Sequence, residues 1–447
     1  MMRSLFSAVS GLKAHQTKMD VIGNNISNVN TVAYKSQSVT FGDVYYQTTQ
    51  TATGPSDTTG KGGTNAKQIG LGAGVGSIAT AIGTQGATER TDNPWDLCIQ
   101  GDSFFIVKSA GNTYFTRAGD FTTDTNGALV TGDGANVCGW QVDEDGNINK
   151  DVVTPLYATS EEFTYTQPAA TTGVSISGNL DSRTKTDSVC TTNFYDSLGN
   201  EYQATLTLRF NENDAASGTT SYTITGGTVT KNGEATALSV SCDQMLSFNS
   251  NTGASMDSNK NITLTLEDQS DDGANTIANI GVNDGGTTST ITMDASNLTM
   301  YADTTDIKSE KGIKNDTTGR ITGKGKAVGK MTSVGVDESG KIVASYSNGD
   351  TKTIGQIAVT TFKNPAGLEK VGENLYAATL NSGTFDGIGQ EVGATDGKIS
   401  SGYLEMSNVD LADQFTNMIT TQRGYQANSR IITVSDSMLE ELINLKR

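Results

Sequence analysis

The sequence predicts a multidomain, mainly β protein with α-helical termini. Apolar residues recur at helical spacing near both ends of the chain, whereas apolar and polar residues alternate through much of the middle. The 447 residues include 51 glycines and only 5 prolines, a composition that suits short strands joined by tight turns. A chain of this length is long enough for about two to four domains, each with its own core.

The first predicted element is a helix near the N-terminus. Its apolar positions step by threes, fours and sevens through Leu5, Val9, Leu12, Met19, Ile22, Ile26 and Val29. Such spacing produces a narrow apolar seam, which is stable only when a partner helix covers it.

This helix runs into a segment with four asparagines, Asn24, Asn25, Asn28 and Asn30. Asparagine is a poor helix former because its side chain competes for backbone hydrogen bonds. We therefore expect the helix to end here as the chain turns away. Two roles stay open for these amides: they bond to neighbouring segments or subunits, or they cap and turn the chain within one subunit.

Residues 36–69 are predicted to connect the first helix to a β domain. Within them, residues 48–66 read TTQTATGPSDTTGKGGTNA. This composition is typical of a linker or of an extended, poorly packed segment.

The middle of the chain is predicted to form two β domains. A discontinuous β domain is expected over residues 70–155 and 325–404, where runs such as SFFIVKSAGNTYFTRAGDF and KIVASYSNGDTKTIGQIAVTTF are rich in strand formers. Residues 156–324 are richer in Thr, Ser, Asn and Gly, and we expect them to form an inserted β domain. Five residue pairs predict hairpin turns: Asn126-Gly127, Asp133-Gly134, Asp145-Gly146, Asn232-Gly233 and Asn348-Gly349.

The last predicted element is a second helix near the C-terminus, which Asp410 or Asn408 is expected to cap. Its apolar positions are Leu411, Phe415, Met418, Tyr425, Ile432, Leu439 and Leu442, with Gln422 and Ser429 also on the seam. Burying seven such side chains contributes roughly 10–20 kcal/mol before opposing costs, but only against a partner. The two terminal helices can pair within one chain, or their seams can pack partly on other copies.

Composition argues against several classes of function. The formal net charge of −18 argues against binding to nucleic acid or anionic lipid, both of which require a basic face. No stretch approaches the roughly 20 apolar residues of a membrane span, and we expect no Sec signal peptide at the start of the chain. His15 is the only histidine and the 4 cysteines form no CxxC pair, so we expect no metal site.

Three motif fragments resemble ligand-binding loops only in part. Residues 54–62, GPSDTTGKG, have the wrong spacing for a phosphate-binding loop, and IGLGAGVG, residues 69–76, lacks a surrounding βαβ unit. Residues 143–151, DEDGNINKD, place glycine too early for a calcium loop, and we expect a hairpin turn there instead.

Candidate catalytic groups are equally few. The adjacent carboxylates Asp271 and Asp272 are typical of surface charge, as are Glu161 and Glu162, because acid–base catalysis requires a positioned, desolvated pair. We expect His15 to lie at solvent or at an interface. The sequence therefore predicts no enzyme activity and no cofactor, and a glycan-binding β protein remains an alternative from another class.

Both ends and the middle resemble one family, the rod and hook proteins among the flagellar axial proteins of bacteria. The N-terminal signature is SGLKAHQTKMDVIGNNISNVNTVAYK, in which Ala33 stands where the family usually has glycine. The C-terminal signature is GYLEMSNVDLADQFTNMITTQRGYQANSRIITVSDSMLEELINLKR. Matching inner blocks are NPWDLCIQGDSFFIV, YFTRAGDF, NGALVTGDG, FYDSLGN and NPAGLEKVGENLYAATLNSG, with Ser103 in place of a usual glycine. The chain resembles hook proteins rather than the shorter rod proteins in three respects: its length, the FYDSLGN block at the start of the insert, and the LINLKR end.

The resemblance implies an architecture and a function. Residues 1–35 and 405–447 would pair as a coiled-coil-like inner domain, followed by the discontinuous β domain and the inserted outer β domain. The implied function is that of a structural hook subunit that polymerises head-to-tail into a curved, flexible tube, a universal joint that transmits torque from the motor to the filament. A distal rod protein or another axial protein of the family is the alternative.

The resemblance also implies partners and a location. The partners are copies of the chain itself, rod proteins, the hook cap, the hook–filament junction proteins and the flagellar type III export apparatus, with no nucleic acid and no membrane insertion. The location is the extracellular flagellum, reached without a cleaved signal peptide. Some hook proteins join neighbouring subunits through a cysteine-derived link to lysine, but we expect Cys190 to be a small buried residue.

The residues expected to pack subunits together lie on the terminal helices and in their motifs. They are Leu5, Val9, Leu12, Met19, Ile22, Asn24, Asn25, Ile26, Asn28, Val29, Leu411, Phe415, Met418, Gln422, Arg423, Tyr425, Asn428, Ile432, Leu439 and Leu442.

Overall fold

The computed structural model describes most of the chain. The described residues are 2–55, 60–143, 146–184, 186–211, 218–231, 233–242, 244–268, 282–283, 288–314, 320–395 and 397–445. Several positions named above lie outside them: Asp145 and Asn232 of two predicted turns, the pair Asp271 and Asp272, residues 56–59 of GPSDTTGKG, residues 144–145 of DEDGNINKD and the last two residues of LINLKR.

The chain forms two compact units. Unit 1 comprises Met1–Glu161, Ser333–Ala344 and Lys352–Arg447, and unit 2 comprises Glu162–Thr332 and Ser345–Thr351. The fold is mainly β with two long terminal helices, as the sequence predicts. The finer four-part division of the chain stays a prediction.

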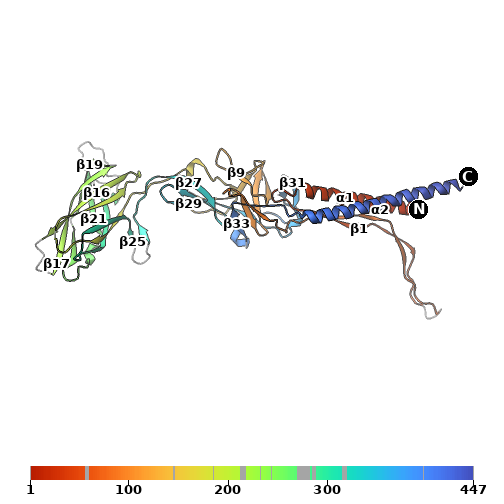
Figure 1. The fold of residues 1–447 in the computed structure, drawn as a ribbon, viewed down its shortest axis with the longest axis horizontal. Coiled ribbons are helices and arrows are strands. Elements are labelled where there is room, and N and C mark those ends of the chain that lie inside the picture. Colours follow the sequence, from red (N-terminus) through yellow and green to blue (C-terminus); the bar gives the residue numbers. More distant parts are fainter. Residues whose placement is uncertain are drawn as a thin grey trace. The chain divides into compact units, whose positions relative to one another are not determined.

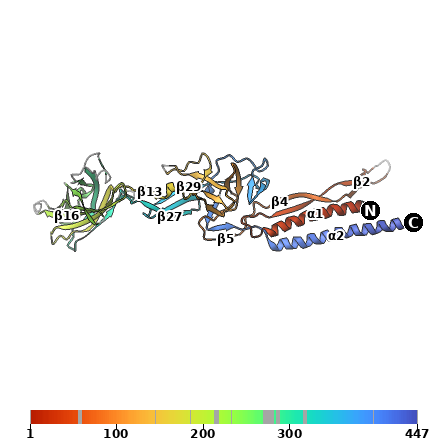
Figure 2. The same ribbon diagram turned by 90° about the horizontal axis from the view of Figure 1, so that it is seen from above.

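The two helices of unit 1 lie side by side and antiparallel. Helix α1 spans Met2–Ser27 and α2 spans Leu411–Asn444, and both views show them paired along their length (Figures 1 and 2). Asp410 is the N-cap of α2, since its carboxylate accepts hydrogen bonds from the backbone N–H groups of Ala412 and Asp413. Of the two predicted caps, Asp410 is therefore correct, and Asn408 has another role described below.

A long β-hairpin follows α1. Strand β1 (Gln37–Asp43) pairs with β4 (Ala73–Thr80), and β2 (Tyr46–Gln50) pairs with β3 (Lys67–Gly70). Residues 36–69 thus contain β1, β2 and most of β3, so they belong to both arms of this hairpin, and their assignment as a connector stays a prediction. Close to α1, the Ser10 hydroxyl accepts a hydrogen bond from Ala73 N, and Gly72 passes with φ of 130° where a side chain would clash with Ser10.

The β core of unit 1 is built from two distant stretches of the chain. Its strands are β5 (Thr88–Arg90), β6 (Leu97–Gln100), β7 (Phe104–Ser109), β8 (Asn112–Thr116), β9 (Phe121–Thr123), β10 (Leu129–Thr131), β11 (Asn136–Gln141), β12 (Thr154–Pro155), β29 (Thr351–Ile357), β30 (Val359–Thr360), β31 (Glu369–Gly372), β32 (Leu375–Ala377), β33 (Lys398–Ser401) and β34 (Tyr403–Glu405). The main sheet runs in the order β29-β11-β7-β8-β32-β31, so β31 is an edge strand. Three short helical turns, Glu161–Phe163, Pro365–Gly367 and Val392–Thr395, and strands β27 (Gly329–Val336) and β28 (Lys341–Tyr346) complete this part of the chain.

Aromatic side chains dominate the core between these strands. Phe115 packs edge-on against Phe362 with ring centroids 4.8 Å apart, and Phe105 packs likewise against Phe121 at 5.0 Å. The buried cluster around the first pair includes Ile82, Phe104, Ile106, Phe115, Cys138, Trp140, Ala358, Leu368 and Tyr376.

Unit 2 is almost entirely β. Its strands are β13 (Tyr165–Thr166), β14 (Gly173–Asn179), β15 (Ser188–Tyr195), β16 (Glu201–Asn211), β17 (Thr219–Thr225), β18 (Thr228–Lys231), β19 (Glu234–Ser241), β20 (Met245–Asn249), β21 (Ile262–Asp268), β22 (Val282–Asn283), β23 (Thr288–Thr299), β24 (Asp306–Lys311), β25 (Ile313–Lys314) and β26 (Ile321–Thr322), with a helical turn at Asp257–Asn259. The main sheet has the order β20-β17-β16-β18-β19-β21-β23-β14-β24, and its β14–β23 pair is parallel. Cys190 is 2% exposed in the core of this sheet, as expected.

The predicted turn pairs mark hairpins where the structure describes them. Gly127, Gly134, Gly146, Gly233 and Gly349 all have φ between 79° and 89°. Glycine adopts this left-handed conformation without the steric cost that a Cβ imposes. Local turn chemistry therefore located the strands correctly.

The unit 2 core gives a direct stability test. Leu206 on β16 is fully buried, so Leu206→Ala is expected to lower the free energy of unfolding by about 2–5 kcal/mol. Leu198 lies in the turn after β15 and is 62% exposed, so Leu198→Ala is the matched control and should change it by less than about 0.5 kcal/mol. Hydrogen exchange of peptides from β16 measures the free energy of unfolding of both variants. Equal protection in Leu206→Ala and Leu198→Ala would contradict the assigned core.

Candidate functional site

The contact between the two helices is made mostly by small and polar residues. A Cβ added to Gly11 would lie 2.8 Å from the Asn428 amide nitrogen, and one added to Gly424 would lie 2.7 Å from the His15 ring. Small side chains therefore let the helices approach closely. The most buried residues of the pair are Ala8, Ala14, Ile22, Asn25, Thr421 and Ser435.

The large apolar side chains of α2 point mostly away from α1. Phe415 is 50% exposed, Ile419 is 58% exposed and Val434 is 57% exposed. We call the whole set the outer stripe: Leu411, Phe415, Ile419, Tyr425, Ile431, Val434, Met438, Leu442, Ile443 and Leu445. An isolated subunit thus leaves in water the side chains whose burial contributes most, about 1.5–3 kcal/mol each.

The C-terminal end of α2 also has no α1 residue beside it. Asn25 bonds to Gln414 and Gly11 lies at Asn428, so this antiparallel register brings the start of α1 level with Ser437. Residues 438–445 extend beyond that point, and Leu445 at their end is 82% exposed.

The structure therefore divides the single seam that the sequence predicts on α2. Met418, Asn428, Ile432 and Leu439 are half-buried, whereas Leu411, Phe415, Gln422, Arg423, Tyr425 and Leu442 are exposed. On the N-terminal side, Ile22 and Asn25 are buried, Leu5, Val9, Leu12, Met19, Ile26, Asn28 and Val29 are half-buried, and Asn24 is exposed. The prediction of one narrow apolar seam on α2 needs correction, because Thr421 and Ser435 occupy the buried face. Whether the predicted residues pack subunits together stays a prediction.

The asparagines at the end of α1 bond within the chain. Asn25 is fully buried: its amide donates to Gln37 O at 2.8 Å and to Gln414 Oε1 at 3.1 Å, and its oxygen accepts from Gln37 N at 2.9 Å. Asn28 donates to Asn24 O at 2.9 Å and accepts from the Thr31 hydroxyl. Asn25 therefore joins α1, the start of β1 and the first turn of α2.

The turn that follows requires an unusual backbone. Ala33 has φ of 54° and is buried, and its N–H donates to Glu405 O at 2.7 Å. Left-handed backbone favours glycine, so the Cβ of Ala33 makes this conformation strained.

A buried ion pair joins the chain leaving α1 to the chain entering α2. Lys35 and Glu405 are each 1% exposed, and Lys35 Nζ lies 2.6 Å from Glu405 Oε1. Lys35 also donates to Thr84 O at 2.8 Å, and Gly86 N donates to the same Glu405 oxygen at 2.9 Å. Burial lowers the pKa of the Lys35 ammonium, and Glu405 opposes that shift.

Two further residues complete this junction. Asn408 accepts from Ser36 N at 2.7 Å and donates to Ala81 O and Thr84 O, both at 3.0 Å. Arg117 is buried with its guanidinium 4.9 Å from the Phe104 ring centroid and its Nη1 3.8 Å from Glu405 Oε2. The junction thus joins both helices and the residues that follow strand β4 to the β core.

Sequence reasoning did not find this junction. Lys35 and Glu405 lie 370 residues apart, and neither stands in a pattern that indicates burial or pairing. Only their presence inside the two terminal signatures, VAYK and GYLE, set them apart.

His15 lies where α1, α2 and β1 meet. Its ring packs edge-on against Phe41 with centroids 5.4 Å apart, and its buried Nδ1 has no hydrogen-bond partner within the described residues. Burial, together with the nearby Lys18 charge, lowers the pKa of His15 below its usual 6.5.

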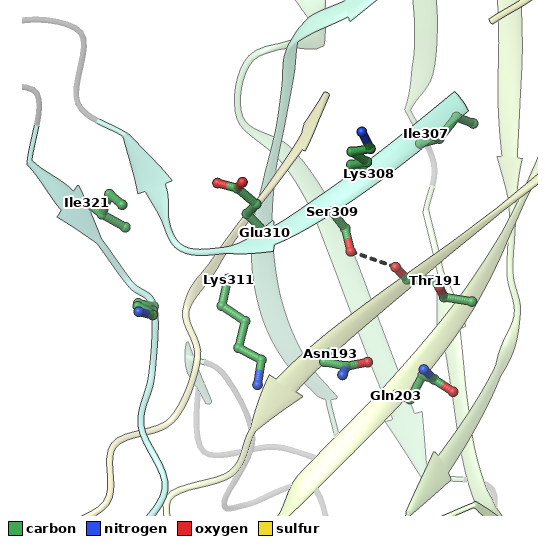
Figure 3. Close-up of a pocket in the computed structure, with 10 residues that line it drawn as sticks. Thr191, Asn193, Gln203, Ile307, Lys308, Ser309, Glu310, Lys311 and Ile321 are labelled. Atoms are coloured by element: carbon green, nitrogen blue, oxygen red, sulfur yellow. Dashed lines mark hydrogen bonds between the residues drawn. The ribbon is translucent and has the colours of Figure 1, made fainter. Parts of the chain in front are cut away.

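Unit 2 contains a polar groove of about 680 Å³ between β15, β16 and β24 (Figure 3). Ser309 reaches across it to donate to Thr191 O at 2.6 Å, and Lys311 pairs with Glu201 at 2.7 Å. Because the Lys311 charge is already paired and the groove brings together no acid–base pair, we place the functional site on unit 1.

Within the described residues, no group of His, Cys, Asp or Glu side chains could hold a metal ion. Over the same residues, no helix combines the length and the apolar character needed to cross a membrane.

Three family models match this chain. Residues 5–35 match the model described as flagella basal body rod protein, residues 98–179 the flagellar hook protein FlgE/F/G D1 domain, and residues 400–445 the flagellar basal body rod FlgEFG protein C-terminal region. The first and last of these cover most of the two helices together with Lys35 and Glu405.

Full-length relatives agree with these matches. The chain is 37% identical to the flagellar hook protein FlgE of Borreliella burgdorferi and 36% identical to that of Treponema pallidum, with 100% of each chain covered. It is 30% identical to the flagellar basal-body rod protein FlgG of Bacillus subtilis, again over 100% of both chains. The crystal structure of the Helicobacter pylori flagellar hook protein FlgE2 aligns over 71% of this chain and 100% of that one, with a TM-score of 0.42 and 15% identity, which is too low to carry an argument.

Removing the Glu405 carboxylate tests the junction. Glu405→Ala leaves the Lys35 ammonium buried without its counter-charge, which should lower the free energy of unfolding by about 3–5 kcal/mol. Glu338→Ala removes an exposed pair with Lys398 and should cost less than about 1 kcal/mol. Denaturant unfolding followed by tryptophan fluorescence reports on unit 1, because both tryptophans lie in it. Equal midpoints for the two variants would contradict a stabilising junction.

The helix pair is expected to lose stability in acid. The folded state lowers the pKa of His15, so below pH 6.5 the unfolded chain binds a proton that the folded chain does not yet bind. Stability is therefore full above 6.5 and falls as pH drops toward the folded-state pKa of His15. Thermal unfolding by circular dichroism, compared between about pH 8 and about pH 5, should show a larger loss for the natural chain than for His15→Gln. A pH dependence identical in both chains would show that His15 makes no contribution.

Proposed function

We propose that this chain is a structural subunit of the flagellar hook and that it polymerises with copies of itself. The chain belongs to the family of flagellar hook and basal-body rod proteins. Two relatives that match over their whole length at 36–37% identity are named hook proteins, which supports the hook rather than another part of the axial structure. The chain is therefore a component of the flagellum.

The observation that carries the proposal is the distribution of side chains on α2. Thr421 and Ser435 are buried against α1, while Phe415, Ile419 and Val434 face away from it. A helix that served only an intramolecular pair would bury its large apolar residues, since their transfer from water is the main source of stability. We infer that other copies of the chain cover the outer stripe.

The type of assembly follows from the same surfaces. The outer stripe lies on α2, and we propose that it contacts a different surface of the next copy. Contacts between different surfaces of identical chains are heterologous, and they generate open helical polymers when the rotation does not close. A helical tube with the paired helices as its inner wall is the assembly that we propose.

Finer aspects of the function belong to the same proposal. We propose that residues 156–324 form an outer domain, that the polymer is a flexible joint between motor and filament, and that rod, cap and junction proteins bind at its ends. Export through the flagellar type III apparatus and the absence of enzyme activity are part of it. Support comes from the family, whose full-length relatives are named flagellar hook and basal-body rod proteins.

A distal rod protein is the second candidate. It is favoured by the match to the Bacillus subtilis rod protein at 30% identity over the whole of both chains. Antibodies against unit 2 separate the two candidates, since they would label a tube outside the cell for a hook and a structure within the envelope for a rod.

Polymerisation should depend on the outer stripe. Ile419→Asp and Val434→Asp place a charge on exposed positions, so the monomer should keep its free energy of unfolding within about 0.5 kcal/mol. Tubes should nevertheless be absent in electron micrographs, because the charge would be buried between copies. Leu198→Asp, on an equally exposed leucine of unit 2, is the control and should leave tubes intact. Normal tubes from both α2 variants would exclude this stripe from the interface.

A further inference from the structure

Leu380 is the most exposed large apolar side chain in the described part of the chain. It is 101% exposed, although it sits in a turn, residues 379–382, close to the β core of unit 1. A leucine side chain left in water would contribute about 1.5–3 kcal/mol if a contact with another surface buried it.

Hydrogen bonds hold this turn in place. The Thr379 hydroxyl donates to Gly367 O at 2.6 Å, Thr379 N donates to the Ser382 hydroxyl at 2.8 Å, and Ser382 N donates back to Thr379 O at 3.2 Å. The Asn364 amide adds a bond to Asn381 O at 3.2 Å. Leu380 is therefore presented on a prearranged turn, which lowers the entropy lost on docking.

A hollow of about 630 Å³ lies beside Leu380. Its lining residues are Glu369, Ala378, Thr379, Leu380, Asn381, Gly383 and Thr384. Glu369 lies on the edge strand β31, whose pairing with β32 has a register irregularity between Lys370 and Gly372. Val371 lies within that irregularity and is 54% exposed. We call Glu369, Val371, Ala378, Leu380 and Thr384 the Leu380 surface.

A second unpartnered apolar surface lies at the end of the long hairpin. Every residue of β2 and β3 is exposed. Tyr45 is 73% exposed, Tyr46 is 57% exposed and Ile69 is 45% exposed. We call residues 44–50 and 67–71 the hairpin end.

The two surfaces carry opposite charges. Glu369 at the rim of the hollow is exposed and forms no ion pair with any described residue, and the same holds for Lys67 on β3. The positive charge of Lys67 is complementary to the negative charge of Glu369, and each residue belongs to a surface that also exposes large apolar side chains. In a chain with a net charge of −18, such a lysine favours contact with a carboxylate.

We propose that the hairpin end of one copy docks on the Leu380 surface of a second copy. The inference rests on the proposed function, since it assigns one of the contacts between polymerised chains. Leu380 and Val371 pack against the hairpin tyrosines and Ile69, and Glu369 pairs with Lys67. The two surfaces lie on different elements, so the contact is heterologous and repeats without closing.

Photocrosslinking in the assembled full-length chain identifies the partner. A benzophenone amino acid that replaces Leu380 should, on irradiation, give covalent dimers whose adducts map to the hairpin end. The same amino acid in place of Leu198 is the control and should give no adduct there. Absence of dimers, or adducts on another segment or another protein, would overturn the proposal.

A charge exchange tests the pairing itself. Glu369→Lys and Lys67→Glu should each raise the subunit concentration needed for assembly by about two- to fivefold, and the double variant should restore it. A double variant no better than the weaker single variant would refute the Glu369–Lys67 contact.

Removal of the leucine measures its share of the contact. Leu380→Ser should raise the concentration needed for assembly by about 10- to 100-fold without changing monomer stability, because the side chain makes no core contact. Leu198→Ser should leave assembly unchanged. If Leu380→Ser also assembles normally, this inference fails while the proposed function stands, and if the natural chain forms no polymer, the proposed function itself fails.

Discussion

The buried ion pair between Lys35 and Glu405 is the constraint on which the arrangement of unit 1 depends. It lies where the chain leaves α1 and where it enters α2. The same two side chains also bond to Thr84 O and Gly86 N, which follow strand β4. Two buried charges are costly unless they face each other and their remaining hydrogen bonds are made. Backbone groups of a separate segment of the chain make these hydrogen bonds. That segment and the segments that carry Lys35 and Glu405 must therefore come together before either charge can be buried. The position of the helix pair on the β core is fixed by this requirement.

The contact between the two helices, in contrast to the buried ion pair, leaves large apolar side chains exposed. Gly11 and Gly424 allow close approach, but the seam they make buries little apolar area, and the outer stripe is left in water. A monomer built in this way is held by its junction rather than by its helices, and binding of other copies would stabilise the helices by mass action. The same logic explains why Asn25 is buried: an amide that bonds to Gln37 and Gln414 orients both helix ends without large apolar contacts.

Local signals predicted much of this fold and failed at long range. Helical spacing located α1 and α2, Asp410 was among the two expected caps, and the glycines of the turn pairs marked hairpins where described. The strands within residues 36–69 were not predicted, because β2 and β3 are exposed throughout and pair with each other rather than with a core, while β1 pairs with β4 outside this range. On α2, spacing alone could not tell the face covered by α1 from the outer stripe, since apolar residues occur around most of the helix.

The sequence by itself determined the class of the fold, the location of its two helices and the family resemblance. These properties depend on neighbours within a few turns of chain or on composition, and both are visible in one dimension. The tertiary structure alone decided which residues are buried together. Lys35 meets Glu405 across 370 residues, and Leu380 is exposed only because its turn is held by Gly367 and Asn364. Contacts of this kind arise from packing of distant segments, and no local pattern in the sequence encodes them.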